Sequence, residues 1–233
     1  MTKLFAAALL LLAVPSRAQL LTGQKILSIG VGGAGGGGRT DWTALGGPKE
    51  QDYGGGGAFD VQYLYQLAPN VGIGGEFEYA GLGQKDHTLT NYTVRNGGEV
   101  YTFEFVSRYA FRANTTIRPF LTAGLGIAAQ KAYALTTPRP GATWAGTGTR
   151  ETRTNWDTTL TAPSASLGVG LEGDLNPRFA LGAELRLRSR GFDKTVVDGA
   201  LGGTHDFAAE GGLSFLLRLA YRFGGFAEAG FIK

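Results

Sequence analysis

Apolar and polar residues alternate along most of this chain with a period of two. The clearest segment is 207–223, where every second residue from Phe207 to Phe223 is apolar and most of the residues between them are small or charged. A period of two predicts a β-strand whose two faces meet unlike environments. The segment is longer than the 5–6 residues typical of a strand in a soluble domain, and longer than the 9–11 that a tilted strand needs to cross a bilayer.

The same alternation recurs in seven earlier segments, at 24–38, 58–67, 71–83, 99–111, 119–133, 162–175 and 179–192. Short turns follow the second, fourth and sixth segments, and two of them contain proline, at Pro69 and Pro177. Long connections follow the odd-numbered segments, at 39–52, 84–97, 134–161 and 193–205. An even number of strands with alternating long and short connections is typical of outer-membrane barrels. We therefore predict an all-β chain folded as an eight-stranded antiparallel transmembrane up-and-down β-barrel.

The alternation does not say which face points outward, because a soluble barrel of the lipocalin type would place the apolar face inside. Here the apolar face carries many large aromatic residues, while an eight-stranded barrel has an interior just wide enough for its side chains. The opposite face is rich in Gly, Ala and Ser, which fit such an interior, and the lipocalin Gly-x-Trp signature is missing near the amino terminus. We therefore expect the apolar face to meet lipid.

This assignment predicts two sets of residues. A charge network is expected in the lumen, because buried charges must pair; it consists of Asp60, Glu76, Glu78, Glu104, Arg108, Glu172, Asp174, Glu184, Arg186, Arg188, Glu210, Arg218 and Arg222, with Arg190 on the same face. Aromatic girdles are expected at the two membrane interfaces; they consist of Tyr63, Tyr65, Tyr79, Tyr101, Tyr109, Tyr221 and Phe223.

The segment L-T-A-G-L-G-I-A-A and the hairpin S-L-G-V-G-L-E-G-D-L-N-P-R-F-A-L-G-A-E-L-R-L resemble the small bacterial outer-membrane β-barrel family, porin-like barrels that include the transmembrane domain of OmpA-type proteins. The closing segment, which ends in Tyr-Arg-Phe, resembles the last strand of that family. The resemblance implies a barrel surrounded by outer-membrane lipid and lipopolysaccharide. It also implies insertion by the barrel-assembly machinery, which reads the closing strand.

The amino terminus predicts export. Lys3 precedes an apolar run at 4–14, and Ser16 and Ala18 are small residues at the spacing that a signal peptidase reads. We expect a signal peptide at 1–18, a barrel domain at 19–233 and a location in the bacterial cell outer membrane. Loss of the signal peptide, with two basic residues and no acid, lowers the net charge from +3 to +1 and gives no electrostatic reason to expect a nucleic-acid partner. The chain has no cysteine, which excludes disulfides and thiolate metal sites.

These observations favour an integral outer-membrane protein with a structural or surface-interaction role, no enzymatic activity, no cofactor and no metal. The lumen charges are interpreted as an ion-pair plug. One alternative is a small-solute channel or porin, although aqueous channels belong to barrels of about 16–18 strands. A second alternative is a lipid A-modifying enzyme. The two histidines, His87 and His205, fall in the predicted connections, and no His-x-Ser-Asn pattern occurs. The sequence identifies no external ligand.

Overall fold

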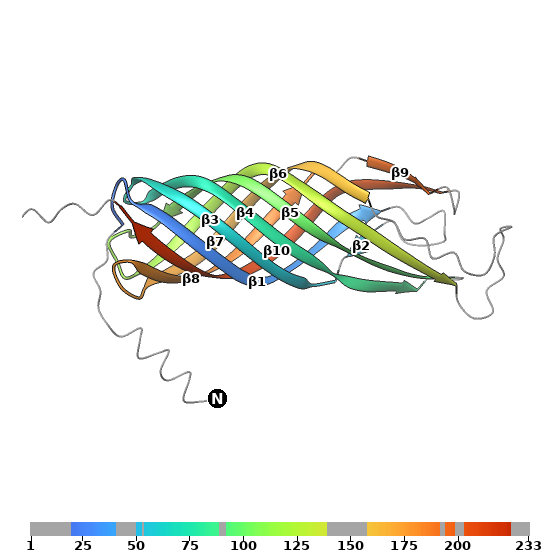
Figure 1. The fold of residues 1–233 in the computed structure, drawn as a ribbon, viewed down its shortest axis with the longest axis horizontal. Coiled ribbons are helices and arrows are strands. Elements are labelled where there is room, and N and C mark those ends of the chain that lie inside the picture. Colours follow the sequence, from blue (N-terminus) through green and yellow to red (C-terminus); the bar gives the residue numbers. More distant parts are fainter. Residues whose placement is uncertain are drawn as a thin grey trace, which may run out of the picture.

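The computed structural model describes residues 20–40, 50–52, 54–88, 92–138, 158–191, 194–198 and 203–224, and its regular structure there is a single β-sheet (Figure 1). The strands are β1 (Lys25–Thr40), β2 (Glu50–Asp52), β3 (Gly56–Ala68), β4 (Val71–Thr88), β5 (Tyr92–Ala110), β6 (Ile117–Pro138), β7 (Thr158–Asp174), β8 (Phe179–Arg190), β9 (Lys194–Asp198) and β10 (Gly203–Phe223). No helix in this part of the chain is long and apolar enough to cross a membrane.

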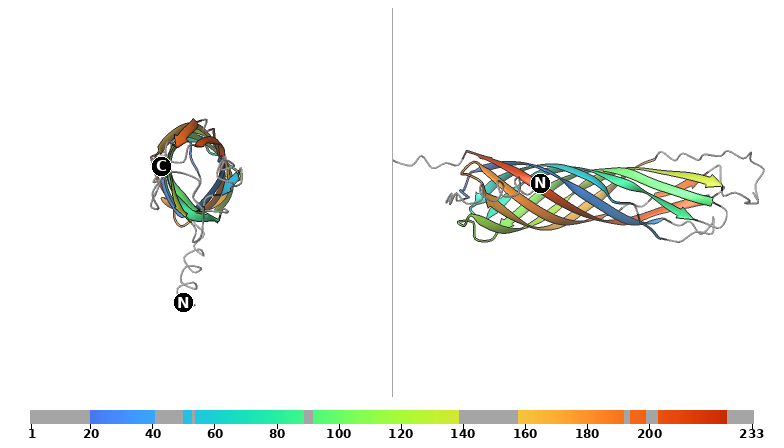
Figure 2. Two further views of the ribbon diagram at one scale, coloured as in Figure 1. Left: turned by 90° about the vertical axis from the view of Figure 1, so that its right-hand side faces the viewer. Right: turned by 90° about the horizontal axis from the view of Figure 1, so that it is seen from below.

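The sheet closes on itself because the first long strand, β1, pairs with the last, β10. Eight strands form the ring in the order β1, β3, β4, β5, β6, β7, β8, β10, and each is antiparallel to both neighbours. Figure 2 shows this ring from one end. The short strands β2 and β9 pair only with the ends of β1 and β10 on the side of the long connections. The prediction of an all-β, eight-stranded antiparallel barrel is confirmed.

The stagger of the ring fixes its width. A row of paired residues that starts at Ile26 in β1 passes once through every strand and returns to β1 at Gly36, ten residues further along. With a rise of about 3.3 Å per residue and a strand spacing of about 4.8 Å, this stagger tilts eight strands by about 40° from the barrel axis. The interior of such a barrel is filled by its own side chains.

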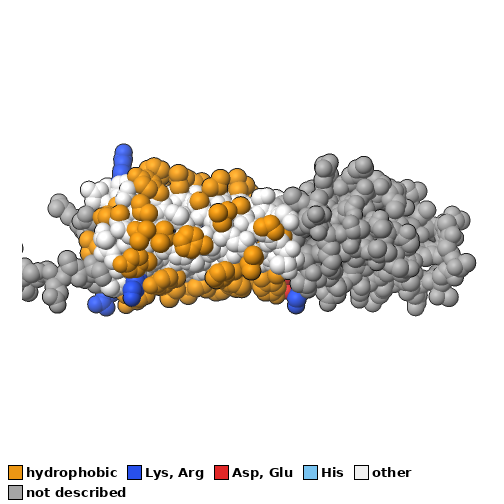
Figure 3. All heavy atoms as spheres, turned by 90° about the horizontal axis from the view of Figure 1, so that it is seen from above, with side chains coloured by type: hydrophobic (Ala, Val, Ile, Leu, Met, Phe, Trp, Pro, Cys, Tyr) orange, Lys and Arg blue, Asp and Glu red, His pale blue; other side chains and the backbone are white. Residues whose placement is uncertain are grey.

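The outer surface is apolar and the interior is charged, which reverses the arrangement of a soluble protein. In the described part of the chain, 28 large hydrophobic side chains are exposed, and hydrophobic side chains cover much of the barrel wall in Figure 3. An apolar surface of this extent requires a non-aqueous surrounding. The arrangement therefore rules out the soluble lipocalin-type barrel.

Strand pairing on the side of the long connections continues further than the alternation indicates. β4 and β5 stay paired as far as Thr88 and Thr93, so the prediction of a loop over 84–97 is wrong for most of its length. The predicted loop 134–161 is also too long, because β6 ends at Pro138 and β7 begins at Thr158.

The other two long connections contain strands as well. β2 lies in the predicted connection 39–52, and β9 together with the start of β10 lies in 193–205. We attribute these differences to the environment: beyond the apolar belt, backbone pairing can continue without the contrast between faces that produces a period of two.

Candidate functional site

The barrel interior holds a balanced set of buried charges, and we take it as the candidate site. Among the described side chains, seven acids and seven arginines are buried, with none more than 7% exposed; they are Asp60, Glu76, Glu78, Glu104, Glu172, Asp174, Glu184, Arg108, Arg118, Arg186, Arg188, Arg190, Arg218 and Arg222. A buried charge without a partner is costly, so the geometry of pairing decides what this set can do.

The larger group of ion pairs, here called the central layer, lies around the middle of the barrel. It consists of Asp60, Glu76, Glu78, Glu104, Glu184, Arg186, Arg188 and Arg218. Arg188 in β8 pairs with Glu76 in β4 at 2.8 Å, and also with Glu78. Arg186 pairs with Glu76 as well. Because β4 and β8 lie half a turn apart in the ring, these pairs cross the full diameter of the lumen.

Arg218 is the connecting residue of the central layer. Its three guanidinium nitrogens lie 2.6 Å from Asp60, 3.1 Å from Glu76 and 2.9 Å from Glu184. Arg186 contacts Glu184 from the other side, at 2.6 Å. A planar guanidinium with five N–H groups suits this multiple pairing, which a lysine could not reproduce.

Neutral side chains complete the hydrogen bonding of two glutamates in this layer. Ser164 and Ser166 donate hydrogen bonds to Glu104 at 2.5 and 2.6 Å. Gln62 donates to Glu76 at 2.6 Å. Both glutamates therefore have neutral donors as well as an arginine.

A second group, here called the turn-side layer, lies nearer the short turns. It consists of Arg108, Arg118, Glu172, Asp174 and Arg222. Glu172 lies 2.7 Å from Arg108, 3.1 Å from Arg118 and 2.5 Å from Arg222. Asp174 pairs with Arg118 and lies 2.6 Å from Arg222. Three arginines thus surround two carboxylates.

Sequence reasoning missed Arg118, which is 1% exposed and donates to Asp174 at 2.7 Å. It lies directly before Pro119, the first residue of the predicted segment 119–133, whereas β6 already begins at Ile117. Its position two residues before Phe120 and four before Thr122, both of which face the lumen, was the signal that could have identified it.

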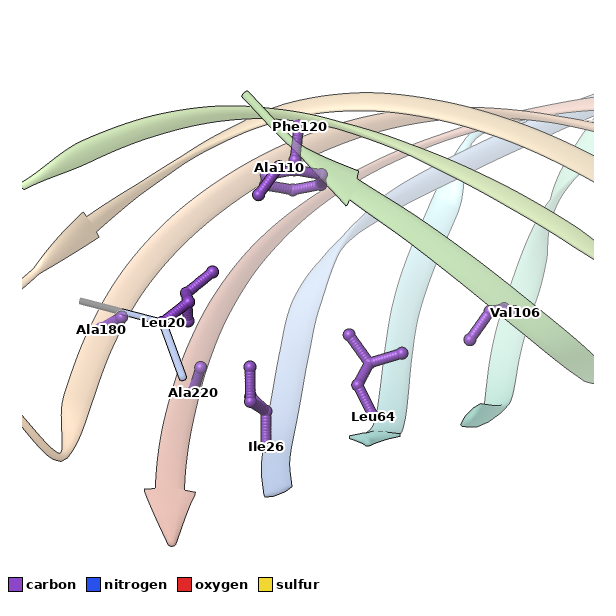
Figure 4. Packing of buried hydrophobic residues seen from close by; sticks show 8 residues of the cluster. All are labelled: Leu20, Ile26, Leu64, Val106, Ala110, Phe120, Ala180 and Ala220. Carbon is purple, nitrogen blue, oxygen red and sulfur yellow. The ribbon is translucent and has the colours of Figure 1, made fainter. Parts of the chain in front are cut away.

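An apolar group lies beside the turn-side layer. Figure 4 shows its members, which come from six ring strands and the segment before β1: Leu20, Ile26, Leu64, Val106, Ala110, Phe120, Ala180 and Ala220. The Arg108 guanidinium lies over the Phe120 ring, 3.6 Å from its centroid, in a cation–π contact. Leu20 is buried, and its amide donates a hydrogen bond to the Ala113 carbonyl at 3.4 Å. The chain before β1 therefore enters the barrel at the short-turn end.

Glycines make room for the long charged side chains. A Cβ at Gly30 would collide with the Asp60 carboxylate, and a Cβ at Gly168 would collide with that of Glu184. The lumen therefore combines long charged residues with positions that have no side chain.

The aromatic residues predicted for the girdles lie on the outer wall. Tyr63, Tyr65, Tyr109 and Tyr221 are exposed, and Phe223 is half-buried and stacked on Tyr221 with ring centroids 5.8 Å apart.

Nearer the long connections, Tyr79 and Tyr101 face each other across β4 and β5, 5.3 Å apart. The aromatic residues thus gather at two heights on the wall, and their placement at the membrane interfaces stays a prediction.

Three residues considered from the sequence lie outside the described side chains, namely Glu210, His87 and His205. Arg190 is buried and has interaction partners, and it lines a small cavity with Glu78 and Arg188. Within the described residues, no group of three or more His, Cys, Asp or Glu side chains could hold a metal ion.

Several solved structures are similar to the chain at low sequence identity. Neisserial surface protein A (NspA) is 13% identical, with a TM-score of 0.48 over 85% of this chain and 97% of that chain. The attachment invasion locus protein Ail of Yersinia pestis is 16% identical, with a TM-score of 0.47 over 87% and 100% of the two chains. OprG from Pseudomonas aeruginosa is 11% identical, with a TM-score of 0.44 over 88% and 98%. No curated protein matches the sequence significantly.

A family model covers nearly the whole chain. The model described as "Outer membrane protein beta-barrel domain" matches residues 4–223, which include every strand of the ring. The closed antiparallel ring and its apolar outer wall agree with this match. The chain belongs to the outer membrane protein beta-barrel domain family.

Proposed function

We propose that this outer-membrane protein is a non-enzymatic barrel with a structural or surface-interaction role, whose lumen is closed by ion pairs. The observation that carries the proposal is the set of bridges from Arg186 and Arg188 in β8 to Glu76 and Glu78 in β4, on the opposite wall. A permeating solute would have to break these bridges.

One cavity described beside the central layer is small. A cavity lined by Glu78, Arg188 and Arg190 has a volume of about 10 Å³, roughly the space that one water molecule requires. This supports a closed lumen.

The pairing of the carboxylates also supports a non-enzymatic role. Each of the seven buried acids has at least one arginine partner. A general acid or base must be able to reach and exchange a proton with a substrate. Carboxylates enclosed by guanidinium groups inside a filled barrel do not meet that condition.

Strand length supports a surface-interaction role. β6 has 22 residues, about twice the number that a tilted strand needs to cross a bilayer. Part of the barrel wall therefore extends beyond the hydrocarbon layer. This extension carries an exposed ion pair, in which Arg95 donates two hydrogen bonds to Asp86 at 2.6 and 2.8 Å.

The proposal includes the route to the membrane. We infer that a signal peptide is removed after Ala18, that the barrel-assembly machinery recognises β10, and that lipopolysaccharide contacts the wall on the side of the long connections. The burial of Leu20 in the barrel supports a mature chain that begins shortly before it. The intact mass of the protein extracted from outer membranes should correspond to a chain starting at Gln19.

Planar-bilayer conductance of the refolded protein tests the closed lumen. We expect no steady pore for the native chain, and ion flow when Arg186→Ser and Arg188→Ser together remove the bridges across the diameter. Asp86→Asn, which removes a pair outside the lumen, is the matched control and should stay closed. A steady pore in the native chain would overturn the proposal and favour the small-solute channel.

A further inference from the structure

The described residues at the short-turn end of the barrel include exposed cations and no exposed acid. Lys25, Arg112 and Arg178 are exposed there, and Figure 3 shows basic side chains projecting from this end. In the part of the chain that the structure describes, their side chains form no ion pair. The acid closest to this end in β7, Asp174, is buried and paired in the turn-side layer. Among the residues that the structure describes, the rim is therefore a positively charged surface with no exposed acid to neutralise it.

Two of these cations adjoin the aromatic residues of the short-turn end in sequence. Arg112 follows Phe111, whose ring lies 5.0 Å from that of Tyr109. Arg178 precedes Phe179, whose ring lies 5.1 Å from that of Tyr221.

Lys25 adjoins the same aromatic level through strand pairing, because it lies opposite Tyr65 in β3 and Phe223 in β10. Aromatic belts of membrane proteins lie at the level of the lipid headgroups. An aromatic belt at that level would place the three cations at the depth of the headgroup phosphates, within reach of their flexible side chains.

The backbone of Arg112 gives independent support. Its φ of 53° makes it the single non-glycine residue with positive φ in the described part of the chain. Glycine or asparagine is favoured in this region, where a Cβ is strained. In this turn the Arg112 carbonyl accepts hydrogen bonds from the Thr115 amide at 3.0 Å and from the Thr115 hydroxyl at 2.8 Å, and neither bond uses the Arg112 side chain. Nothing in the turn requires arginine, so its charge is the feature to explain.

We propose that these three cations bind the phosphate groups of anionic phospholipid headgroups in the leaflet at the short-turn end. Their distribution favours lipid over a protein partner. Lys25 lies on β1, Arg112 in the turn between β5 and β6, and Arg178 in the turn between β7 and β8, so they are spread around the ring. A docked protein would touch one side of the rim, whereas a lipid annulus touches all of it. This inference rests on the membrane placement of the family and not on whether the lumen conducts.

Competition between spin-labelled lipids tests the proposal on the full chain refolded in vesicles. The measured quantity is the association constant of phosphatidylglycerol relative to phosphatidylcholine. Each cation near an anionic surface contributes about fivefold to binding. We expect the native ratio to exceed one, to fall as salt is added, and to approach one when Lys25→Gln, Arg112→Asn and Arg178→Gln are combined.

Arg112→Asn alone decides the question if the triple variant refolds poorly. Asparagine suits a φ of 53°, so this variant should refold as well as the native chain while its preference for phosphatidylglycerol falls up to about fivefold. Arg112→Lys, which keeps the charge, should retain the preference, and so should Lys131→Gln, which removes an exposed cation towards the opposite end of β6. The proposal is wrong if the native chain shows no preference, if Arg112→Asn leaves it unchanged, or if Lys131→Gln lowers it equally.

Discussion

The two faces of the closing strand follow opposite rules. Leu217 is 50% exposed on the outer wall, whereas its neighbour Arg218 is 3% exposed and contacts three carboxylates. The outer face needs only apolar side chains, because lipid chains adapt to their shape. The inner face needs specific partners at specific distances. The comparison teaches that the outer face determines where the barrel can exist, while the inner face determines which set of contacts it forms.

A substitution on the inner face should cause the largest loss in the free energy of unfolding. Arg218→Leu removes the arginine that lies 2.6 Å from Asp60 and takes a partner from Glu76 and Glu184. Removing one member of a buried charge group costs about 3–5 kcal/mol. Urea titration of the refolded variant in lipid vesicles should show this loss in the free energy of unfolding. Adding Asp60→Asn to the variant should recover part of the lost free energy of unfolding, because the unpaired charge is then gone. If Arg218→Leu costs less than the substitution of an outer-face residue by alanine, the assignment of Arg218 to the inner face is contradicted.

The outer face should give the next largest effect. Leu217→Arg places a charge against lipid, which costs about 2–4 kcal/mol near the middle of the bilayer. The same urea titration measures it. Leu217→Met keeps the surface apolar and should be close to neutral. An unchanged stability for Leu217→Arg would mean that this face does not meet lipid.

Replacing a glycine by alanine on each face compares the room that the two faces leave for one added methyl group. Gly168→Ala directs a Cβ against Glu184, which Arg186 and Arg218 hold in place. Overpacking of this kind costs about 1–3 kcal/mol. Gly211→Ala is the matched control, because nothing lies within 4 Å of its Cβ. Thermal unfolding should show a lower unfolding temperature for Gly168→Ala than for Gly211→Ala. Equal decreases would mean that the lumen can accommodate an additional methyl group at position 168.

The smallest effect is expected for an ion pair outside the lumen. Asp86→Asn breaks the contact with Arg95, in which both side chains are about half exposed. Water solvates each partner after the change, so the stability should not change measurably. Hydrogen exchange of the β4–β5 extension should also stay as in the native chain. A loss comparable to that of Arg218→Leu would show that the extension is less hydrated than its exposure indicates.

The sequence predicted the ring and the assignment of faces, because lipid on one side and a packed lumen on the other impose a period of two. Leu213, Phe215 and Leu217 face outward as expected. The sequence did not predict how far the strands continue beyond the lipid belt, since the contrast between the two faces is lost there. The paired residues from Lys85 to Thr88 were therefore assigned to a loop.

Pairing partners inside the lumen were also beyond prediction. Alternation identified Glu76 and Arg188 as inward residues, but their contact depends on which strands lie opposite each other, and this follows from the strand count and stagger of the closed ring. Phe120 was also hard to predict as an inward residue, because an apolar side chain on the inner face interrupts the alternation of apolar and polar residues. Its position is explained by the buried apolar group that it joins and by the packing of Arg108 on its ring.

The position of two arginines on the last strand has a consequence for the chain before it inserts into the membrane. Arg218 and Arg222 belong to β10, while Asp60, Glu172 and Asp174 belong to strands made earlier. Until its end has arrived, a growing or translocating chain cannot form the contact of Arg218 with Asp60 or the contacts of Arg222 with Glu172 and Asp174. Until then the charged residues stay hydrated. Because they alternate with the apolar residues along the strands, they oppose aggregation in the aqueous periplasm. We therefore expect the residues that pair in the finished barrel also to help keep the unfinished chain soluble.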